Sequence, residues 1–127
     1  MLEIEAIDHV AFSVNDIDQA AAWYTHLFDM ERRYGDVWTG QRDPVVLCNG
    51  SACVALFRCQ DAESLAPDPD HINRHFALKV NRQNFEQVQS RLREAGIDFK
   101  LWDHKVSRSL YLLDPDAHQI EITTYDL

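Results

Sequence analysis

The first half of the chain combines strand-like alternation with one amphipathic helix. Residues 4–14 are rich in Ile, Val and Phe, and their apolar positions alternate with small or polar ones, which predicts a strand. Asn15 is the candidate N-cap of a helix, because apolar residues recur at helical spacing from Ile17 to Phe28. Asn49-Gly50 predicts a hairpin turn. Further strands are predicted at residues 32–39, 44–48 and 52–58.

The pattern of the first half returns in the second. Residues 75–80 predict a strand, and Asn81 is the candidate N-cap of a helix that ends at Gly96. The apolar stripe of this helix comprises Phe85, Val88, Leu92 and Ala95. Three more strands are predicted at residues 97–102, 109–113 and 117–125. Both halves therefore predict the order βαβββ.

Residues 60–73 separate the two patterns. They combine two prolines with four acidic residues and show no apolar period, which is typical of a linker or a lid. The length of 127 residues suits one domain. We therefore expect a single α+β domain made of module 1–59, linker 60–73 and module 74–127.

A shift of 66 residues superimposes the two halves. It aligns HVAFSVN, which starts at His9, with HFALKVN, which starts at His75. The same shift places Ala55 on Glu121. A duplicated module would present these positions to a shared central surface, so His9, His75 and Glu121 form one candidate constellation with Ala55 as its blank fourth corner.

Glu121 is the unusual residue of the last predicted strand, because Ile120 and Ile122 flank it. One interpretation is the polar outer face of a half-buried strand. The other is a metal ligand. Two imidazoles and one carboxylate suit Fe(II), Mn(II) or a similar divalent ion and leave coordination positions open for substrate. The alternative for His9 and His75 is that they are hydrogen-bonded core histidines.

Composition narrows the classes of partner. Twelve Lys and Arg against 21 Asp and Glu give a formal net charge of -9, which disfavours nucleic acid and anionic membranes as partners. The three cysteines, Cys48, Cys53 and Cys59, contain no C-x-x-C pair and predict reduced, packed thiols. No basic leader or long apolar run is present, so we expect a cytoplasmic protein.

Three stretches of the sequence resemble the vicinal oxygen chelate superfamily. They are DHVAFSV near the start, NRHFALKV in the middle and SLYLLDPDAHQIEI at the end. This superfamily includes glyoxalase I, extradiol dioxygenases, fosfomycin-resistance thiol transferases and bleomycin-binding proteins. The resemblance implies two βαβββ modules that form an open, cup-shaped mixed sheet around one divalent ion held by His9, His75 and Glu121. It also implies a homodimer, with the cup often completed between chains, and a small-molecule substrate with two adjacent oxygens.

The extradiol dioxygenases share the most local motif with this chain. Their pattern of a His, an aliphatic-Tyr pair, Asp-Pro and a ligand Glu is matched by His104, Leu110-Tyr111, Asp114-Pro115 and Glu121. The resemblance implies that Tyr111 donates a hydrogen bond to the chelated substrate and that His104 acts as an acid or base. Two departures are Ala117, where the family usually has Gly, and Trp102, where it has a smaller residue. The leading expectation is thus a dioxygenase with Fe(II) or Mn(II), with Zn(II) and Ni(II) as other candidates.

Other members of the superfamily fit less well. Glyoxalases similar to this chain carry a Glu where Ala55 stands, and bleomycin-binding members lack the metal ligands. Fosfomycin transferases match the length and the ligand set, but they place a hydroxyl residue where this chain has Ala11. A thiol transferase or hydrolase of this type, or a protein that sequesters a small molecule, remains the alternative.

The remaining histidines and aromatic residues are assigned more modest roles. We expect His118 to serve the turn that precedes Glu121, and His26 and His71 to be solvated. Three aromatic residues are candidates for lining the cup, namely Trp38, Phe57 and Trp102.

Overall fold

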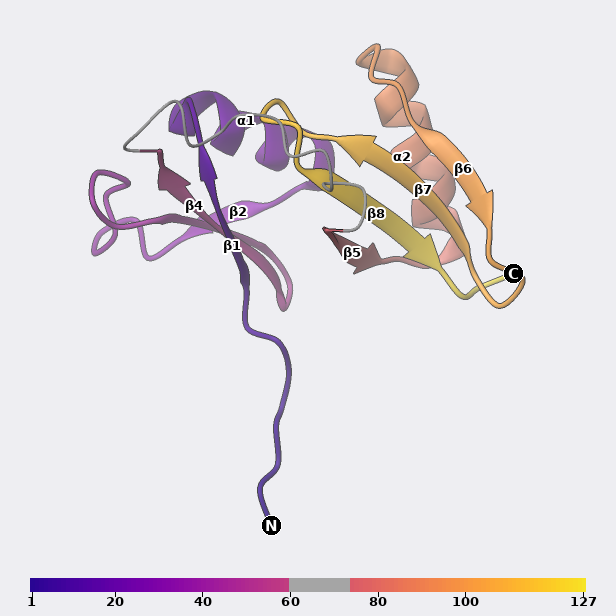
Figure 1. Cartoon of the computed structure of the whole chain (residues 1–127), viewed down its shortest axis with the longest axis horizontal. Helices are drawn as coiled ribbons and strands as arrows, with labels where there is room; N and C mark the ends of the chain where they lie inside the picture. Colours follow the sequence, from indigo (N-terminus) through magenta and orange to yellow (C-terminus); the bar gives the residue numbers. More distant parts are fainter. Residues whose placement is uncertain (60–73) are drawn as a thin grey trace. The chain divides into compact units, whose positions relative to one another are not determined.

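The computed structural model describes residues 1–59 and 74–127, which form two compact units. The predicted linker, residues 60–73, and His71 within it lie outside the described residues. Each unit is βαβββ and contains a four-stranded mixed sheet and one helix (Figure 1). The expected α+β class with two such modules is therefore confirmed. Among the described residues, no helix is long and apolar enough to cross a membrane.

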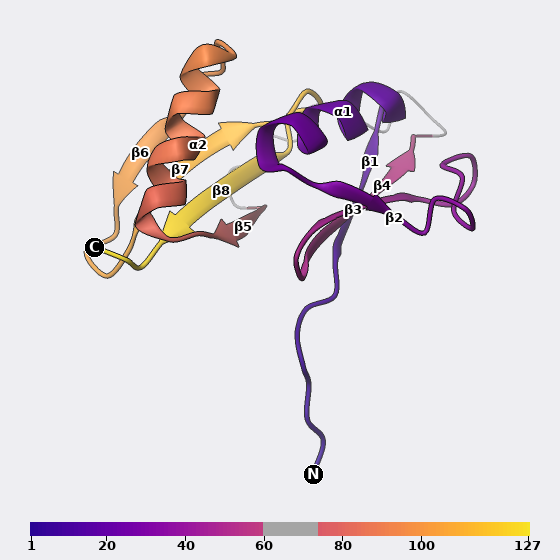
Figure 2. The same ribbon diagram turned by 180° about the vertical axis from the view of Figure 1, so that it is seen from behind.

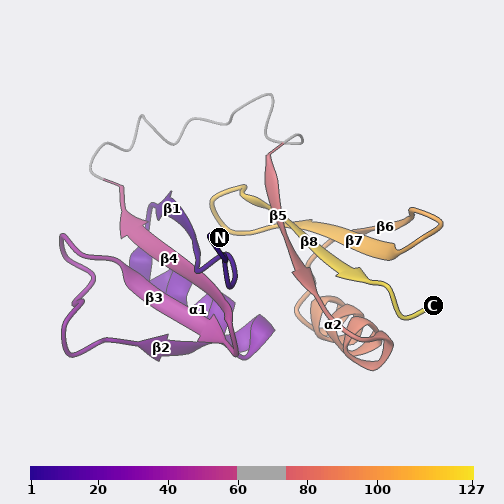
Figure 3. The same cartoon turned by 90° about the horizontal axis from the view of Figure 1, so that it is seen from below.

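The first unit builds its sheet in the order β1-β4-β3-β2, with β1 parallel to β4 and the other pairs antiparallel. Its elements are β1 (Val10–Val14), α1 (Ile17–Phe28), β2 (Glu31–Arg33), β3 (Val45–Asn49) and β4 (Ala52–Arg58). Helix α1 covers one face of this sheet (Figure 3). Ile17, Tyr24 and Leu27 are buried along that face of the helix, as the spacing of apolar residues predicts.

Helix α1 begins one residue later than the sequence predicts. Its N-cap is Asp16, not Asn15, and the Asp16 carboxylate accepts a hydrogen bond from the Gln19 backbone N–H at 3.0 Å. Both residue types can cap a helix, so composition alone did not choose between them.

The second unit builds its sheet in the order β5-β8-β7-β6, again with the first pair parallel. Its elements are β5 (His75–Lys79), α2 (Arg82–Glu94), β6 (Lys100–Asp103), β7 (Arg108–Leu113) and β8 (Gln119–Thr124). Asn81 caps α2 as predicted, and Gly96 adopts a φ of 69° just beyond its end.

Helix α2 packs against the face of the second sheet that carries its aliphatic residues (Figure 2). The buried residues of this core are Phe85, Leu92, Leu110, Leu112, Ile120 and Ile122. Because side chains alternate along a strand, Tyr111 and Glu121 lie on the opposite face. The core thereby fixes which face carries the polar residues.

The strand register reproduces the 66-residue repeat. Ala11 lies opposite Ala55 in the first sheet, and Ala77 lies opposite Glu121 in the second. Both residues of the first pair differ from those of the second by 66, so the parallel strand pairs of the two modules share one register. Ala55 therefore occupies the position in the first sheet that Glu121 occupies in the second. The β3–β4 register differs by one residue, because Val46 lies opposite Ala55 whereas Tyr111, which corresponds to Val45, lies opposite Glu121.

Two predicted strands are shorter than expected. The strand predicted at residues 4–14 starts at Val10, and residues 1–9 lie outside any strand. Val10 pairs with Val54 and β4 starts at Ala52, so residues before Asp8 extend past the start of β4. The strand predicted at 32–39 ends at Arg33, because Tyr34 turns with a φ of 60°.

Smaller differences concern a turn and one strand start. The hairpin between β3 and β4 turns at Gly50-Ser51, since Asn49 still pairs with Ala52. The strand predicted at residues 97–102 is β6, which starts at Lys100.

The prediction that all three cysteines are reduced is wrong. Cys48 and Cys53 form a disulfide, while Cys59 is a half-buried thiol. Cys48 and Cys53 lie directly opposite each other on β3 and β4, with their Cα atoms 4.1 Å apart. Cross-strand neighbours come this close without a C-x-x-C spacing, so the spacing of the cysteines along the chain does not reveal this pair.

Candidate metal centre

His75 and Glu121 meet on the polar face of the second sheet. His75 is the first residue of β5 and Glu121 lies in the middle of β8. The Nε2 atom of His75 lies 2.9 Å from Oε1 of Glu121. The His75 side chain is 34% exposed and that of Glu121 is 12% exposed, so solvent reaches the pair from one side.

This donor pair fits a divalent ion. Two ligand atoms at neighbouring corners of an octahedron, with bonds of about 2.1 Å, are about 3 Å apart. The separation of 2.9 Å between His75 Nε2 and Glu121 Oε1 matches that spacing, and it is also the length of a direct hydrogen bond between the two groups. An imidazole nitrogen and a carboxylate oxygen also suit Fe, Mn, Zn or Ni.

Tyr111 and His104 lie beside this pair. Tyr111 is directly opposite Glu121 in the β7–β8 register, and its ring packs edge-on against His75 with a centroid distance of 5.9 Å. His104 Nε2 lies 2.9 Å from the Tyr111 hydroxyl oxygen. Burial, followed by the charge and hydrogen bonding of Glu121, raises the pKa of Tyr111 above 10.0, and the Ser109 hydroxyl opposes the shift. Tyr111 therefore keeps its proton at neutral pH.

Ser109 is a residue of this site that the sequence reasoning missed. It lies two positions before Tyr111 and on the same face of β7. Its hydroxyl lies 2.6 Å from Oε2 of Glu121. Alternation along β7 could have placed Ser109 on the face of Glu121, but the contact depends on the β7–β8 register.

His9, the third predicted ligand, belongs to the first unit. It stands one residue before β1, and its Nδ1 atom lies 2.7 Å from Oδ2 of Asp8. The structure thus brings His75, Glu121, Tyr111 and His104 together within residues 74–127. That His9 joins His75 and Glu121 stays a prediction.

The equivalent face of the first sheet carries an apolar cluster around Ala55. Ala55 packs with Val46 and Cys48, against which Cys53 and Phe57 also pack. Charged residues of β2 border this cluster, because Glu31 lies opposite Cys48 and Arg33 lies opposite Val46. The contrast between Ala55 and Glu121 is therefore a difference at one position, where the second sheet carries a carboxylate and the first does not.

A second group of potential ligands lies in the turn before β8. Asp114, Asp116 and His118 offer donor atoms that all lie within 4.8 Å of one another. Asp114 Oδ1 accepts hydrogen bonds from the backbone N–H groups of Asp116 and His118, and Oδ2 lies 2.8 Å from His118 Nδ1. These contacts close the turn, which agrees with the role predicted for His118.

The other predicted residues are distributed over both units. His26 is exposed on α1, as expected. Trp38 contacts Tyr34, and Phe57 belongs to the apolar cluster around Ala55. Trp102 is 63% exposed and lies opposite Ser109 in the β6–β7 register, with its ring 6.5 Å from that of His104. Of the three aromatic residues expected to line the cup, Trp102 is therefore the one beside the polar face of the second sheet.

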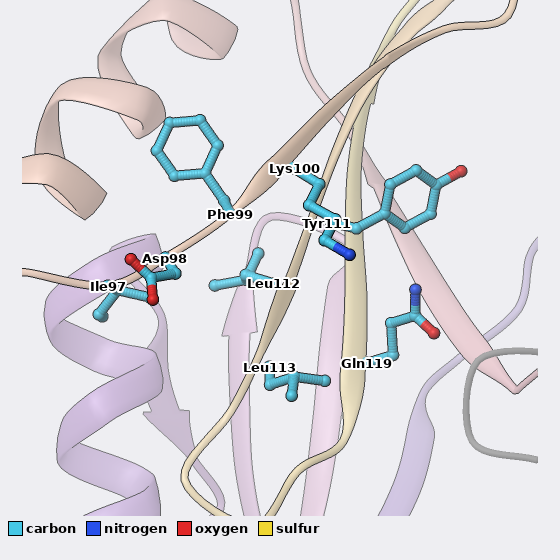
Figure 4. A pocket seen from close by; sticks show the side chains of 8 residues that line it. All are labelled: Ile97, Asp98, Phe99, Lys100, Tyr111, Leu112, Leu113 and Gln119. Carbon is cyan, nitrogen blue, oxygen red and sulfur yellow. The ribbon is translucent and has the colours of Figure 1, made fainter. Parts of the chain in front are cut away.

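A pocket of about 590 Å³ adjoins Tyr111 (Figure 4). Its lining includes the apolar residues Phe99, Leu112 and Leu113, and the polar residues Asp98, Lys100 and Gln119. This volume suits a small molecule. The pocket therefore offers space for an apolar group beside the Tyr111 side chain.

Comparisons with known proteins identify the family of the chain. Residues 6–122 match the model of the Glyoxalase/Bleomycin resistance protein/Dioxygenase superfamily. The chain is 27% identical over 126 residues to the metallothiol transferase FosB of Staphylococcus epidermidis, which covers 97% of this chain and 84% of that protein. It is 22% identical to the glutathione transferase FosA of Serratia marcescens, over 94% of this chain and 80% of the relative.

Solved structures share the fold. The fosfomycin resistance protein FosX of Listeria monocytogenes superimposes with a TM-score of 0.74 at 17% identity, covering 96% of this chain and 94% of that one. A lactoylglutathione lyase from Agrobacterium tumefaciens gives a TM-score of 0.72 at 23% identity, covering 95% and 94%.

Proposed function

The chain belongs to the glyoxalase, bleomycin resistance protein and dioxygenase superfamily, and we propose that it is a metal-dependent enzyme that adds a thiol to a small electrophile with two adjacent oxygens. The observation that carries this proposal is the separation of 2.9 Å between His75 Nε2 and Glu121 Oε1. The similarity to two kinds of thiol transferase, over 97% and 94% of this chain, favours this reaction over ring cleavage.

The proposed metal ligands are His9, His75 and Glu121. A divalent ion bound there would act as a Lewis acid on the two substrate oxygens. With three protein ligands, coordination positions would remain for the substrate. The two substrate oxygens would therefore contact the ion, and the remaining atoms of the substrate would contact the surrounding side chains.

Tyr111 is the proposed hydrogen-bond donor to the substrate. Its raised pKa keeps the hydroxyl protonated at neutral pH, so it can donate to an oxygen that gains negative charge. In the reaction, a carbon–sulfur bond forms, a carbon–oxygen bond of the electrophile breaks, and the thiol proton ends on the released oxygen. His104, in contact with the Tyr111 hydroxyl, is the proposed group that passes this proton.

The pocket beside Tyr111 would receive the rest of the substrate or the thiol. Its apolar lining can bury an alkyl or aryl group, and the Lys100 ammonium at its edge can pair with an anionic group (Figure 4).

The decisive experiment measures metal content and thiol transfer together. The full chain is reconstituted with Mn(II), and consumption of a thiol is followed with fosfomycin as the test electrophile. We expect about one equivalent of bound metal in the parent, loss of metal in His9→Ala, His75→Ala and Glu121→Ala, and no loss in His26→Ala, whose residue is exposed on α1. Parent protein that folds but retains no added metal would refute the proposal.

A second candidate function is extradiol-type ring cleavage, the leading expectation from the sequence. The contact of 2.9 Å between His104 and Tyr111 favours it, because the resemblance assigns both residues to that chemistry. Oxygen consumption by the Fe(II)-loaded protein with a catechol would support this function over thiol transfer. Binding of either substrate without turnover would instead identify a sequestering protein.

A further inference from the structure

Ser109 is buried completely, and its hydroxyl contacts two polar side chains of the neighbouring strand. The residue is 0% exposed. Its Oγ atom lies 2.6 Å from Glu121 Oε2 and 2.9 Å from Thr123 Oγ1. A buried hydroxyl needs such partners, because leaving it without a hydrogen bond is costly.

The direction of these hydrogen bonds follows from proton counting. An ionised carboxylate only accepts, so Ser109 donates its single proton to Glu121. The contact at 2.9 Å must then have Thr123 as the donor. The other acceptor near the Thr123 hydroxyl, the Arg108 carbonyl oxygen, is farther away at 3.4 Å. The three side chains therefore form a directed chain from Thr123 to Ser109 to Glu121.

This chain occupies one carboxylate oxygen of Glu121 and the other faces His75, while the Tyr111 hydroxyl also hydrogen-bonds the Glu121 side chain. Oε2 of Glu121 accepts from Ser109, whereas Oε1 faces His75 Nε2 at 2.9 Å. We propose that Ser109 is a positioning residue that holds Glu121 as a metal ligand through one oxygen, with Thr123 orienting the Ser109 hydroxyl. This inference rests on the proposed metal site.

The first sheet has no counterpart of this arrangement. By the repeat in register, Thr123 corresponds to Phe57, just as Glu121 corresponds to Ala55. Phe57 packs in the apolar cluster and has no hydroxyl. Within the described residues, the contacting hydroxyl groups of Ser109 and Thr123 thus occur in the module that carries the Glu121 carboxylate.

Cobalt binding tests the proposal without relying on turnover. The full chain is titrated with Co(II), and both the dissociation constant and the visible absorption spectrum are measured. We expect Ser109→Ala to weaken Co(II) binding by about 10- to 100-fold, the range found when a group supporting a metal ligand is removed. We also expect weaker visible absorption, because the released Oε2 can bind as well and raise the coordination number.

Three further variants separate positioning from packing. Thr123→Val should weaken Co(II) binding in the same direction, while Thr123→Ser, which keeps the hydroxyl, should restore the parent's affinity and spectrum. Ser107→Ala is the matched control, because Ser107 is also buried and its backbone carbonyl accepts a hydrogen bond from the His104 N–H. If Ser109→Ala does not fold, the two Thr123 variants decide the question.

The outcomes distinguish this inference from the proposed function. A parent protein that binds Co(II), together with a Ser109→Ala variant of equal affinity and equal spectrum, would overturn the positioning role alone. A folded parent that binds no metal would overturn the metal site itself.

Discussion

His104 and Tyr111 face each other across the hairpin of β6 and β7, with His104 Nε2 2.9 Å from the Tyr111 hydroxyl oxygen. Because Glu121 lies directly opposite Tyr111, the hydroxyl is held between the imidazole of His104 and a proposed metal ligand.

Tyr111→Phe should lower kcat/KM about 10- to 100-fold while metal content stays unchanged. A hydrogen bond to a charged group contributes about 1.5–3 kcal/mol, and the substitution removes only the donor. Steady-state kinetics with the substrate found for the parent would measure the effect. Tyr125→Phe, at an exposed position beyond β8, is the control and should behave as the parent does. If Tyr111→Phe has the same kcat/KM as the parent, Tyr111 contributes packing and not a hydrogen bond to the substrate.

Reduction of the Cys48–Cys53 disulfide should lower the free energy of unfolding by about 2 kcal/mol, since it releases only a short loop. Urea denaturation with and without reductant would measure the change. Cys59→Ser should show the same response to reductant. Thiol titration of the denatured, unreduced chain should detect one thiol, that of Cys59, and finding three would contradict the disulfide.

Ala117→Gly should stabilise the protein by about 0.5–1 kcal/mol. Ala117 adopts a φ of 66° in the turn between β7 and β8, a conformation that an alanine side chain disfavours and glycine adopts readily. Thermal and urea unfolding would measure the gain. Ala95→Gly is the matched control, because Ala95 has a φ of −81° and should lose stability. Equal losses in both variants would show that the turn imposes no strain.

A dimer whose chains share the metal site, the arrangement expected from the sequence, should show complementation. His9→Ala and Glu121→Ala each lack a proposed ligand, but mixing them after partial unfolding would create mixed dimers with one intact site. We expect metal binding to return in the mixture, measured beside the molar mass by light scattering. A monomeric protein would contradict a shared site, and so would a mixture that binds no more metal than its two components.

The repeat in the sequence predicted much of the fold. Because the 66-residue shift aligned Ala55 with Glu121 before any strand pairing was known, it anticipated that both residues occupy the same place in their sheets. The amphipathic patterns likewise predicted both helices and the buried face of α1. In α2 the predicted stripe is right for Phe85 and Leu92 but wrong for Ala95, which is exposed at the helix end, and Gln89 is buried although it is polar. Periodicity succeeds here because burial of the apolar faces dominates the folding of each module.

Features that depend on partners across strands were not predictable in the same way. β1 starts at Val10, opposite Val54 of β4, and the alternation of residues 4–9 carries no information on that limit. The Cys48–Cys53 disulfide and the contact between Ser109 and Glu121 both depend on register. Local sequence patterns define which side a residue faces, whereas the register defines which residue it meets.

The pairing of strands within each half has a consequence for synthesis on the ribosome. Among the described strands, β1 to β4 hydrogen-bond only with one another, and so do β5 to β8. Residues 10–58 therefore contain every strand of the first sheet, which can form while residues 74–127 are still untranslated. The nascent chain thus has no need to keep half of a sheet unpaired until translation ends.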